Sequence, residues 1–485
     1  MEYVVKGYKP EGLFRFFEEI SAIPRGSGNE KAISDYLVAF AKERGLEVYQ
    51  DESLNVVIRK QGSKGAENAP SVMLQGHTDM VCEKLAGVDH DFEKEGLKLK
   101  VEDGCLTAEG TTLGADNGIA VALMMMVLDD DSLVHPPLEC VFTTEEEVGL
   151  NGARSLDKSM LRSRTMINLD SEEEGIATVS CAGGLRIGFT RDVKREAAEG
   201  TLIQIQIEGL LGGHSGSDID KERANANILM SRMVNAMMRH AGGKLVDFEG
   251  GSKDNAIPRE CMASLIYEDA EMAAKAEEIA CGMAEKFAEE ITSLEPDFSC
   301  EISVEDNKSA QALAEEDARA FLTAIRLAPN GPQKRNPKMG GFVIVSSNLG
   351  VARAGEDQLR IVFAPRSSVA SLQKDMKSRF VLLAETFGFN VTFTGEYPGW
   401  TYKEESAVRE VFQESYRELF GKELKIEAIH AGLECGLFSD AIPGLDAVAV
   451  GPTLYGCHTP DEKLPLDSVE RFYSLLVDVL ERMAK

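Results

Sequence analysis

The sequence of 485 residues predicts an α/β fold, in which a domain with a mostly parallel sheet is interrupted by an inserted α+β domain. Three observations predict it. Short apolar runs alternate with segments of helical spacing in the first part of the chain, as in a parallel sheet covered by helices. After the SCAGG turn at 180–184, strands and long amphipathic helices follow one another instead. From about residue 398 the first pattern returns. We therefore expect 1–184 and 398–485 to form the interrupted domain, and 185–397 to form the inserted one.

The elements of the interrupted domain follow from periodicity. Residues 11–21 and 30–44 carry apolar side chains at helical spacing, and a third helix begins at the GADNG turn, 114–118. Short apolar or β-branched runs that end in polar residues predict buried strands of one sheet. There are four of them: 72–75, 139–144, 165–169 and 446–450. A closing helix is expected at 468–484.

The inserted domain has its own pattern. LRIGFTRDV (185–193) and TLIQIQIEG (201–209) predict neighbouring antiparallel strands, and the breaker-rich PNGPQKRNPKMGG (329–341) predicts a polar loop. Helices with a single apolar stripe are predicted as well. They cover 222–240, 270–291 and 371–389.

Charge and cysteine content exclude several classes of function. The chain has 52 Lys and Arg against 81 Asp and Glu, a net charge of −29, which repels phosphate backbones and argues against nucleic acid as a partner. No basic amphipathic segment points to a membrane surface. Nine cysteines without a CxxC pair, together with a start that lacks signal-peptide features, favour a soluble cytoplasmic protein.

Five short motifs place polar side chains where a sheet presents its ligand site. They are LQGHTDMV with His77 and Asp79, GADNG with Asp116, TTEEEVG with Glu145, Glu146 and Glu147, NLDSEEEG with Asp170, and GCHTPDE with His458. Four of them follow a predicted strand, and the fifth opens a helix. Because ligands bind outside the carboxyl ends of parallel strands, these side chains are expected to meet in one cleft. Mixed imidazole and carboxylate ligands suit zinc, cobalt or manganese, and favour zinc over magnesium or calcium.

Each motif also has a simpler interpretation. GHTD alone is typical of a turn at a strand end, Asp116 can cap its helix, and a run of three Glu is usually a solvated acidic face. Cys82 and Cys457 flank the proposed ligands, but neither has a second cysteine at ligand spacing. The five motifs in this order favour a metal site.

In this order the motifs resemble the co-catalytic di-zinc metallopeptidases related to aminoacylases, and within them the aminoacyl-histidine dipeptidase branch. Further segments that resemble this branch span the rest of the chain. They are GGHSGSDI (212–219), DNAIPRE (254–260), EYPGW (396–400) and HAGLECGLF (430–438). The resemblance implies a metal-binding domain interrupted by an inserted lid domain.

The resemblance also implies a ligand set for two zinc ions per subunit, with cobalt or manganese as substitutes. His77 and Asp170 would hold one ion, Glu147 and His458 would hold the other, and Asp116 would bridge them.

Catalytic roles follow from the same resemblance. The family pattern Glu-Glu-x-Gly makes Glu146 the general base and leaves Glu145 as a bystander. Asp79 would hold the free nitrogen of the His77 imidazole, and His214 of the inserted domain would stabilise the oxyanion of the intermediate. The alternative interpretation of His214 is a surface histidine in a glycine turn.

Substrate-binding candidates are Arg366, whose planar fork suits a free carboxylate, Asn255 as an amide donor, and Gly432, where backbone amides can approach the substrate. The alternative interpretation of Arg366 is that it forms an ion pair at the end of its strand. No role is assigned to further residues in or near these segments. They are Trp400, His430, Glu434 and Cys435.

The expected function is hydrolysis of unblocked dipeptides, with a broad or Xaa-His preference. Two alternatives remain: an amidohydrolase that removes acyl groups from amino acids on the same fold, and a catalytically silent protein that binds peptide or metal. A homodimer through the lid domain is expected, with His214 serving either its own site or that of a partner.

Overall fold

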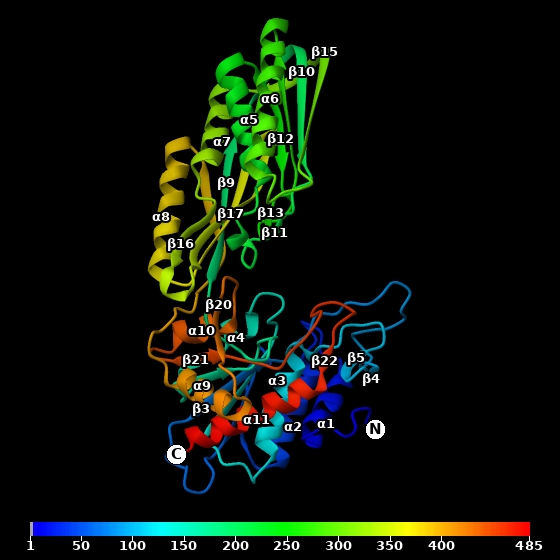
Figure 1. Ribbon diagram of the computed structural model, residues 1–485, viewed down its shortest axis with the longest axis vertical. Helices are drawn as coiled ribbons and strands as arrows, with labels where there is room; N and C mark the ends of the chain where they lie inside the picture. The colour runs from blue at the N-terminus through cyan, green and yellow to red at the C-terminus, as the bar shows by residue number, and fades with distance from the viewer. Residues whose placement is uncertain (1–2) are drawn as a thin grey trace. The chain divides into compact units, whose positions relative to one another are not determined.

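The computed structural model describes residues 3–485, which form two compact units (Figure 1). Unit 1 contains the chain up to Cys181 together with Trp400–Ala428 and Leu433–Lys485. Unit 2 contains Ala182–Gly399 and the short segment Ile429–Gly432. The chain thus returns to unit 2 for four residues within the stretch that the sequence assigned to the interrupted domain.

A mixed eight-stranded sheet forms the centre of unit 1. In spatial order its strands are β1 (Glu47–Gln50), β2 (Val56–Lys60), β6 (Leu138–Thr143), β3 (Val72–His77), β7 (Thr165–Asn168), β21 (Asp446–Ala449), β8 (Ile176–Cys181) and β20 (Lys425–Ile429). Strands β6, β3, β7 and β21 run parallel to one another, whereas β1, β2 and β8 pair antiparallel. The four parallel strands are the four runs that the sequence predicted for one sheet, and this prediction is confirmed.

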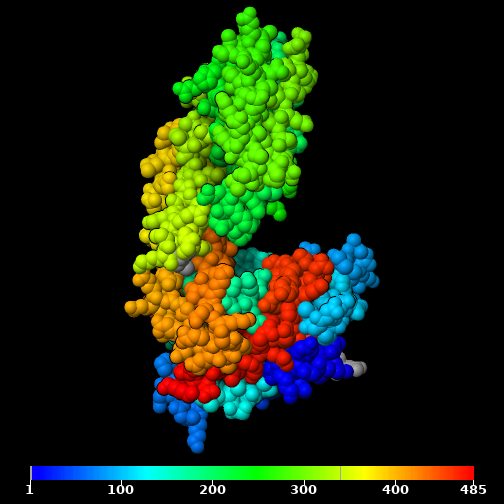
Figure 2. Space-filling view, in the orientation of Figure 1, coloured from blue at the N-terminus to red at the C-terminus, as the bar shows by residue number. Residues whose placement is uncertain are grey.

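Helices cover this sheet. They are α1 (Glu11–Ser21), α2 (Lys31–Glu43), α3 (Ala115–Asp129), α4 (Asn151–Ser155), α9 (Ala407–Phe420), α10 (Glu434–Ala441) and α11 (Leu466–Met483). Helix α3 is buried almost all round, and its Met124 and Met125 are fully buried in the core. A small sheet of β4 (Leu99–Glu102), β5 (Cys105–Ala108) and β22 (Leu464–Pro465) joins the early and late parts of the chain. Figure 2 shows the N-terminal and C-terminal segments side by side on the visible face of unit 1.

Unit 2 is built on an antiparallel sheet with four helices. Its strands follow the spatial order β15 (Ser299–Leu313), β10 (Arg195–Glu208), β14 (Cys261–Tyr267), β12 (Lys244–Gly250), β17 (Phe342–Ala354), β18 (Gln358–Ser367), β9 (Gly183–Asp192) and β19 (Asn390–Tyr397). The helices lie together on one face of this sheet (Figure 1) and bury a continuous aliphatic and aromatic core against it. They are α5 (Ala226–Ala241), α6 (Ala270–Ile291), α7 (Glu315–Leu327) and α8 (Ala370–Phe387).

This sheet consists of two halves with the same plan. Strands β10, β12, β14 and β15 with α5 and α6 form one half, and β9, β17, β18 and β19 with α7 and α8 form the other. In each half the first strand lies between the third and the fourth. The halves join where β12 pairs with β17, at Glu249 opposite Arg353. The sequence gives no visible sign of this repeat.

Two predictions for unit 2 were wrong. Strands β9 and β10 do not pair with each other, because the link of Val193 and Lys194 contains no turn-forming residue and the chain passes from one half of the sheet to the other. The stretch predicted as a polar loop contains β16 (Gly331–Asn336), which pairs with β17. Its proline lies next to a register shift at the sheet margin, where a missing N–H is tolerated.

Among residues 3–485, no helix combines the length and the apolar character that are needed to cross a membrane.

Candidate metal and catalytic site

The five sequence motifs of unit 1 meet at the carboxyl ends of its parallel strands. His77 is the last residue of β3, Asp170 lies two residues beyond β7, and Glu147 lies four residues beyond β6. Asp116 stands in the first turn of α3, where its backbone and that of Asn117 depart from helical geometry. The ligand atoms of His77, Asp116 and Asp170 all lie within 4.8 Å of one another, as do those of Asp116, Glu147 and His458.

Asp116 is shared by the two groups. Its Oδ1 lies 3.2 Å from Nε2 of His77, and its Oδ2 lies 3.0 Å from Nε2 of His458. A carboxylate that turns one oxygen to each of two imidazoles has the arrangement of a bridging ligand between two metal ions. The structure therefore brings together all five predicted metal ligands.

His77 is buried among carboxylates. Its Nε2 lies 3.6 Å from Oδ1 of Asp170, and its Nδ1 lies 3.3 Å from Oδ1 of Asp79. Burial disfavours the imidazolium, but the negative charges of Asp170 and Asp116 outweigh it and raise the pKa of His77 well above its ordinary value. The surrounding carboxylates thus favour a positive charge at the position of the His77 imidazole.

Asp79 is fully buried and links three parts of the site. Besides His77, it accepts hydrogen bonds from the backbone N–H groups of Glu146 (3.1 Å) and Glu147 (3.2 Å), and from the hydroxyl of Ser27 (2.8 Å). Burial opposes its ionisation, yet these donors and His77 hold the pKa of Asp79 below its ordinary value. One carboxylate therefore orients an imidazole and fixes the backbone of the proposed base and its neighbour.

The donor set fits a divalent ion. Oε1 of Glu147 is buried and makes no hydrogen bond, although Nε2 of His458 lies only 3.0 Å away. A buried acceptor without a hydrogen bond is costly in a native fold unless another partner satisfies it. The hydrogen bond to Asp116 and the negative charge of Glu147 raise the pKa of His458 to about 11. Two imidazoles and three carboxylates are the ligand types that zinc accepts.

Glu146 and Glu145 differ sharply. Glu146 lies within a possible ligand group with His77, and burial, reinforced by nearby carboxylates such as Asp170, raises the pKa of Glu146 to about 9. Glu145 accepts a hydrogen bond from the side chain of Asn151 instead, at 3.0 Å. The structure thus separates the two acids that the sequence places next to each other.

Three buried charged residues beside the site were given no role from the sequence. Glu434 accepts hydrogen bonds from Gln75 (2.5 Å) and Thr143 (2.8 Å), and burial raises its pKa to about 7. Arg25 donates to backbone carbonyls around His77 and Asp116, and Glu462 accepts four backbone N–H groups before and at Asp116. Glu462 closes the GCHTPDE motif and Glu434 stands in the HAGLECGLF segment, whereas Arg25 lies in none of the motifs.

The three cysteines near the site differ in their exposure to solvent. Cys82 is exposed and Cys435 is buried. Cys457 lies within 4.8 Å of ligand atoms of Asp116 and Glu172. Burial and the charge of Glu172 raise the pKa of Cys457, which keeps its thiol protonated.

His214 lies in unit 2, in the short strand β11 (Gly213–His214) that pairs with β13 (Ala256–Ile257). Its Nδ1 accepts from the backbone N–H groups of Gly216 (3.3 Å) and Ser217 (3.2 Å). Burial and the nearby Arg366 guanidinium lower the pKa of His214. An imidazole that is neutral and accepts at Nδ1 carries its proton on Nε2.

Arg366 belongs to a second polar group in unit 2. It is nearly buried on β18, and its Nη1 donates to the hydroxyl of Tyr397 at 2.8 Å. Gly432 packs against the same tyrosine, since a Cβ there would lie 2.9 Å from the Tyr397 ring. His430 hydrogen-bonds to Ser346 at 2.7 Å, and burial together with Arg366 lowers its pKa to about 3. Sequence reasoning missed Tyr397, although it stands in the EYPGW segment.

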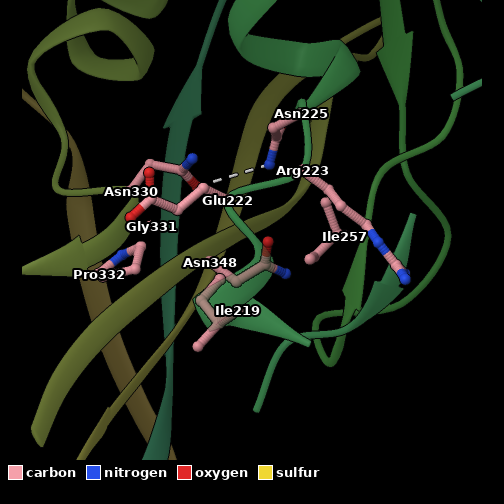
Figure 3. A pocket seen from close by; sticks show the side chains of 9 residues that line it. All are labelled: Ile219, Glu222, Arg223, Asn225, Ile257, Asn330, Gly331, Pro332 and Asn348. Atoms are coloured by element: carbon pink, nitrogen blue, oxygen red, sulfur yellow. Dashed lines mark hydrogen bonds between the residues drawn. The ribbon is translucent and has the colours of Figure 1, made fainter. Parts of the chain in front are cut away.

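Asn255 is exposed, and hydrogen bonds hold its backbone. Its carbonyl accepts from Ser215 N–H at 2.8 Å, and Asn348 donates to the carbonyls of both of its neighbours in the chain. Asn348 also lines a pocket of about 290 Å³ in unit 2 (Figure 3). Trp400 is buried in unit 1, where its backbone forms a bridge with Cys181, which is a structural role.

Comparison with known proteins places the chain among peptidases. The model of peptidase family M20/M25/M40 matches residues 73–482. The cytosol non-specific dipeptidase of Escherichia coli (strain K12) is 35% identical over 481 residues, which cover 98% of both chains. The crystal structure of aminoacylhistidine dipeptidase from Vibrio alginolyticus superposes with a TM-score of 0.92 at 36% identity, covering 98% of this chain and 97% of that one.

A more distant structure shares the fold. Aminopeptidase PepT from Bacillus cereus ATCC 10987 has a TM-score of 0.57 at 16% identity, covering 99% of this chain and 100% of that one.

Proposed function

The chain belongs to peptidase family M20/M25/M40, and from this we propose that it is a metal-dependent dipeptidase that cleaves unblocked dipeptides. The observation that carries the proposal is Asp116, whose two oxygens face His77 and His458 separately. The similarity to two dipeptidases over nearly the whole chain supports the substrate class. A cytoplasmic location and a homodimer formed through unit 2 remain predictions.

Two zinc ions are the proposed cofactors, with cobalt or manganese as substitutes. His77 and Asp170 would hold one ion, Glu147 and His458 the other, and Asp116 both. When bound, such ions lower the pKa of a shared water and polarise the scissile carbonyl.

Glu146 is the proposed general base. It would take a proton from the attacking water and pass it to the leaving amine, as a positioned carboxylate does. Its backbone N–H is held by Asp79, which also orients His77. One buried carboxylate thus holds both the backbone of Glu146 and the imidazole of His77.

His214 is proposed to stabilise the oxyanion. Because its Nδ1 accepts from the backbone, its Nε2 keeps a proton that it can donate. A preorganised N–H donor at this position can hydrogen-bond to the developing negative charge. Burial and the charge of Arg366 lower the pKa of His214, which favours this neutral state.

Arg366 is proposed to bind the free carboxylate of the dipeptide. Its Nε is buried and makes no hydrogen bond, while Nη1 is held by Tyr397. Gly432 would let backbone amide groups approach the substrate terminus, and Asn255 would supply an amide donor. Recognition of a carboxylate close to the scissile bond would restrict the enzyme to short substrates.

A substrate panel tests the proposal. Dipeptides with different C-terminal residues, a tripeptide and N-acetyl amino acids are incubated with the protein before and after chelation. We expect hydrolysis of dipeptides that chelation abolishes and zinc restores. Hydrolysis of N-acetyl amino acids alone would indicate an amidohydrolase, and no hydrolysis by the metal-loaded protein would indicate a silent binding protein.

A further inference from the structure

Glu462 holds the chain segment that carries the shared carboxylate. Its side chain is 2% exposed. Oε2 accepts the backbone N–H groups of Leu113 (2.8 Å) and Gly114 (2.9 Å), and Oε1 accepts those of Ala115 (2.8 Å) and Asp116 (3.3 Å). Four consecutive N–H groups therefore converge on one carboxylate.

These donors surround the start of α3, where backbone N–H groups have no partner within the helix. An anion at such a position is also favoured by the helix dipole. A cap for α3 alone would explain one or two of the bonds. The Glu462 carboxylate also accepts the N–H of Leu113, which precedes the helix, and it therefore fixes the whole turn that leads to Asp116.

The opposite side of this turn is held by a buried cation. Arg25 donates to the carbonyl of Gly114 at 2.5 Å and to that of Thr78, the residue after His77, at 3.0 Å. A Cβ at Gly114 would lie 2.6 Å from Nη2 of Arg25, and one at Gly118 would lie 2.5 Å from it. The turn thus runs between two buried side chains of opposite charge, one binding its N–H groups and the other its carbonyl.

Glu462 is also tied to His458. The N–H of Glu462 donates to the carbonyl of Thr459 (3.1 Å), and the N–H of Thr459 donates to that of Gly456 (3.2 Å). The hydroxyl of Thr107 anchors the carbonyl of Glu462 at 3.0 Å. A displacement of Glu462 would therefore move the Asp116 turn and the His458 loop relative to each other.

We infer that Glu462 is a positioning residue that sets Asp116 against His458 before metal binds, with Arg25 as its counter-charge. The inference rests on the proposed function, because it assigns Glu462 to the metal site of that enzyme. Glu462 itself touches neither metal nor substrate. It acts through the backbone of Asp116.

The test is metal affinity, measured in Glu462→Gln. Glutamine keeps the size of the side chain but offers one acceptor oxygen and turns an NH₂ group toward backbone donors. Metal-stripped protein is titrated with Co²⁺, followed by its visible absorption, and with Zn²⁺ by calorimetry. We expect the more weakly held ion to bind roughly 10–100-fold less tightly, as is typical when a partner of a ligand is lost. We also expect kcat to fall while KM for a dipeptide stays near the wild-type value.

Glu18→Gln is the matched control. Glu18 is a buried carboxylate of α1 that accepts the backbone N–H groups of Val4 (2.8 Å) and Val5 (2.9 Å), away from the ligands. We expect it to lower the melting temperature and leave both metal affinities unchanged. Equal metal affinities in the wild type, Glu18→Gln and Glu462→Gln would overturn the inference and leave Glu462 as a stabilising cap.

A second variant covers the case in which Glu462→Gln does not fold. Glu462→Asp keeps the charge but is shorter by one methylene, so it cannot reach all four donors. We expect it to fold and to bind metal less tightly than the wild type. Wild-type affinity in a folded Glu462→Asp would contradict the inference.

The outcomes separate the inference from the proposed function. A wild-type protein that binds two ions but cleaves no dipeptide overturns the function, and the affinity comparison still decides the role of Glu462. A wild-type protein that binds no divalent ion overturns both.

Discussion

Units 1 and 2 hold their functional groups in different ways. In unit 1, Asp116 contacts both His77 and His458 directly, and further carboxylates lie close to them. In unit 2, His214 and Arg366 contact neutral partners: backbone N–H groups and the hydroxyl of Tyr397. Unit 1 thus gathers negative charge that a cation can balance, whereas unit 2 keeps donors available for an anion.

In both units a buried glutamate accepts hydrogen bonds from backbone N–H groups near a functional residue. Glu462 in unit 1 binds the backbone before Asp116, and Glu295 in unit 2 binds the N–H groups of Leu211 (2.6 Å) and Ala224 (2.8 Å), at the two ends of the loop that carries His214. Both carboxylates are almost fully buried. We therefore expect substitutions in unit 1 to affect metal binding and turnover, and substitutions in unit 2 to leave metal binding intact.

The largest effect is expected at Glu146, the proposed general base. Glu146→Gln should lower kcat by about 10²–10⁴-fold, because the water loses its proton acceptor while both metal groups keep their ligands. Stopped assays of dipeptide hydrolysis and metal analysis by mass spectrometry measure the two quantities. Glu145→Gln is the control and should behave like the wild type. Similar turnover in the two variants would refute the assignment of the base.

The next largest effect is expected at Arg366 in unit 2. Arg366→Met should raise KM for dipeptides about 10–100-fold, since a hydrogen bond to a charged group contributes about 1.5–3 kcal/mol, and metal content should not change. Steady-state kinetics measures it. Arg360→Met, an exposed residue on the same strand, is the control. A loss of metal in Arg366→Met would break the distinction between the units.

A moderate effect is expected at Glu295. Glu295→Gln should loosen the loop that carries His214 and lower kcat about tenfold, because small misplacements of a catalytic group reduce its contribution. Metal affinity should stay at the wild-type value, in contrast to Glu462→Gln. If calorimetry finds both variants impaired in metal binding, the distinction between the two units does not hold.

The smallest effect is a pH dependence of the metal-free protein. The pKa of Glu146 is about 9 in the folded state against an ordinary 4.5, so the folded state keeps a proton that the unfolded state has released. Stability from this group is complete below pH 4.5 and is lost as the pH rises toward 9. Metal-free wild type should melt several degrees lower at pH 8 than at pH 5, and Glu146→Gln should lose less. Differential scanning calorimetry at both pH values decides this.

Much of unit 1 could be predicted from the sequence. The strands that carry His77, Asp170 and Glu147 are short, apolar and ended by polar residues, so both their sheet and the side on which their ends meet could be predicted. The five predicted ligands lie together for that reason. Their roles remain proposals until metal is bound and measured.

Other features depend on tertiary contacts that no local pattern contains. Glu462 binds Asp116 N–H across 346 positions of the chain, and nothing around Glu462 marks it as a backbone acceptor. Tyr397 meets Arg366 only because β18 and β19 both pair with β9. Strands β9 and β10 were predicted to be neighbours because they are consecutive, whereas the repeat within unit 2 places them in different halves.

The requirement that we propose for dipeptide cleavage is two ions held by one shared carboxylate. It is tested most directly by adding Zn²⁺ to metal-stripped protein while dipeptide hydrolysis is followed. We predict that activity rises until two equivalents per chain are bound and then remains constant. Full activity at one equivalent, or no activity at any, would contradict the claim.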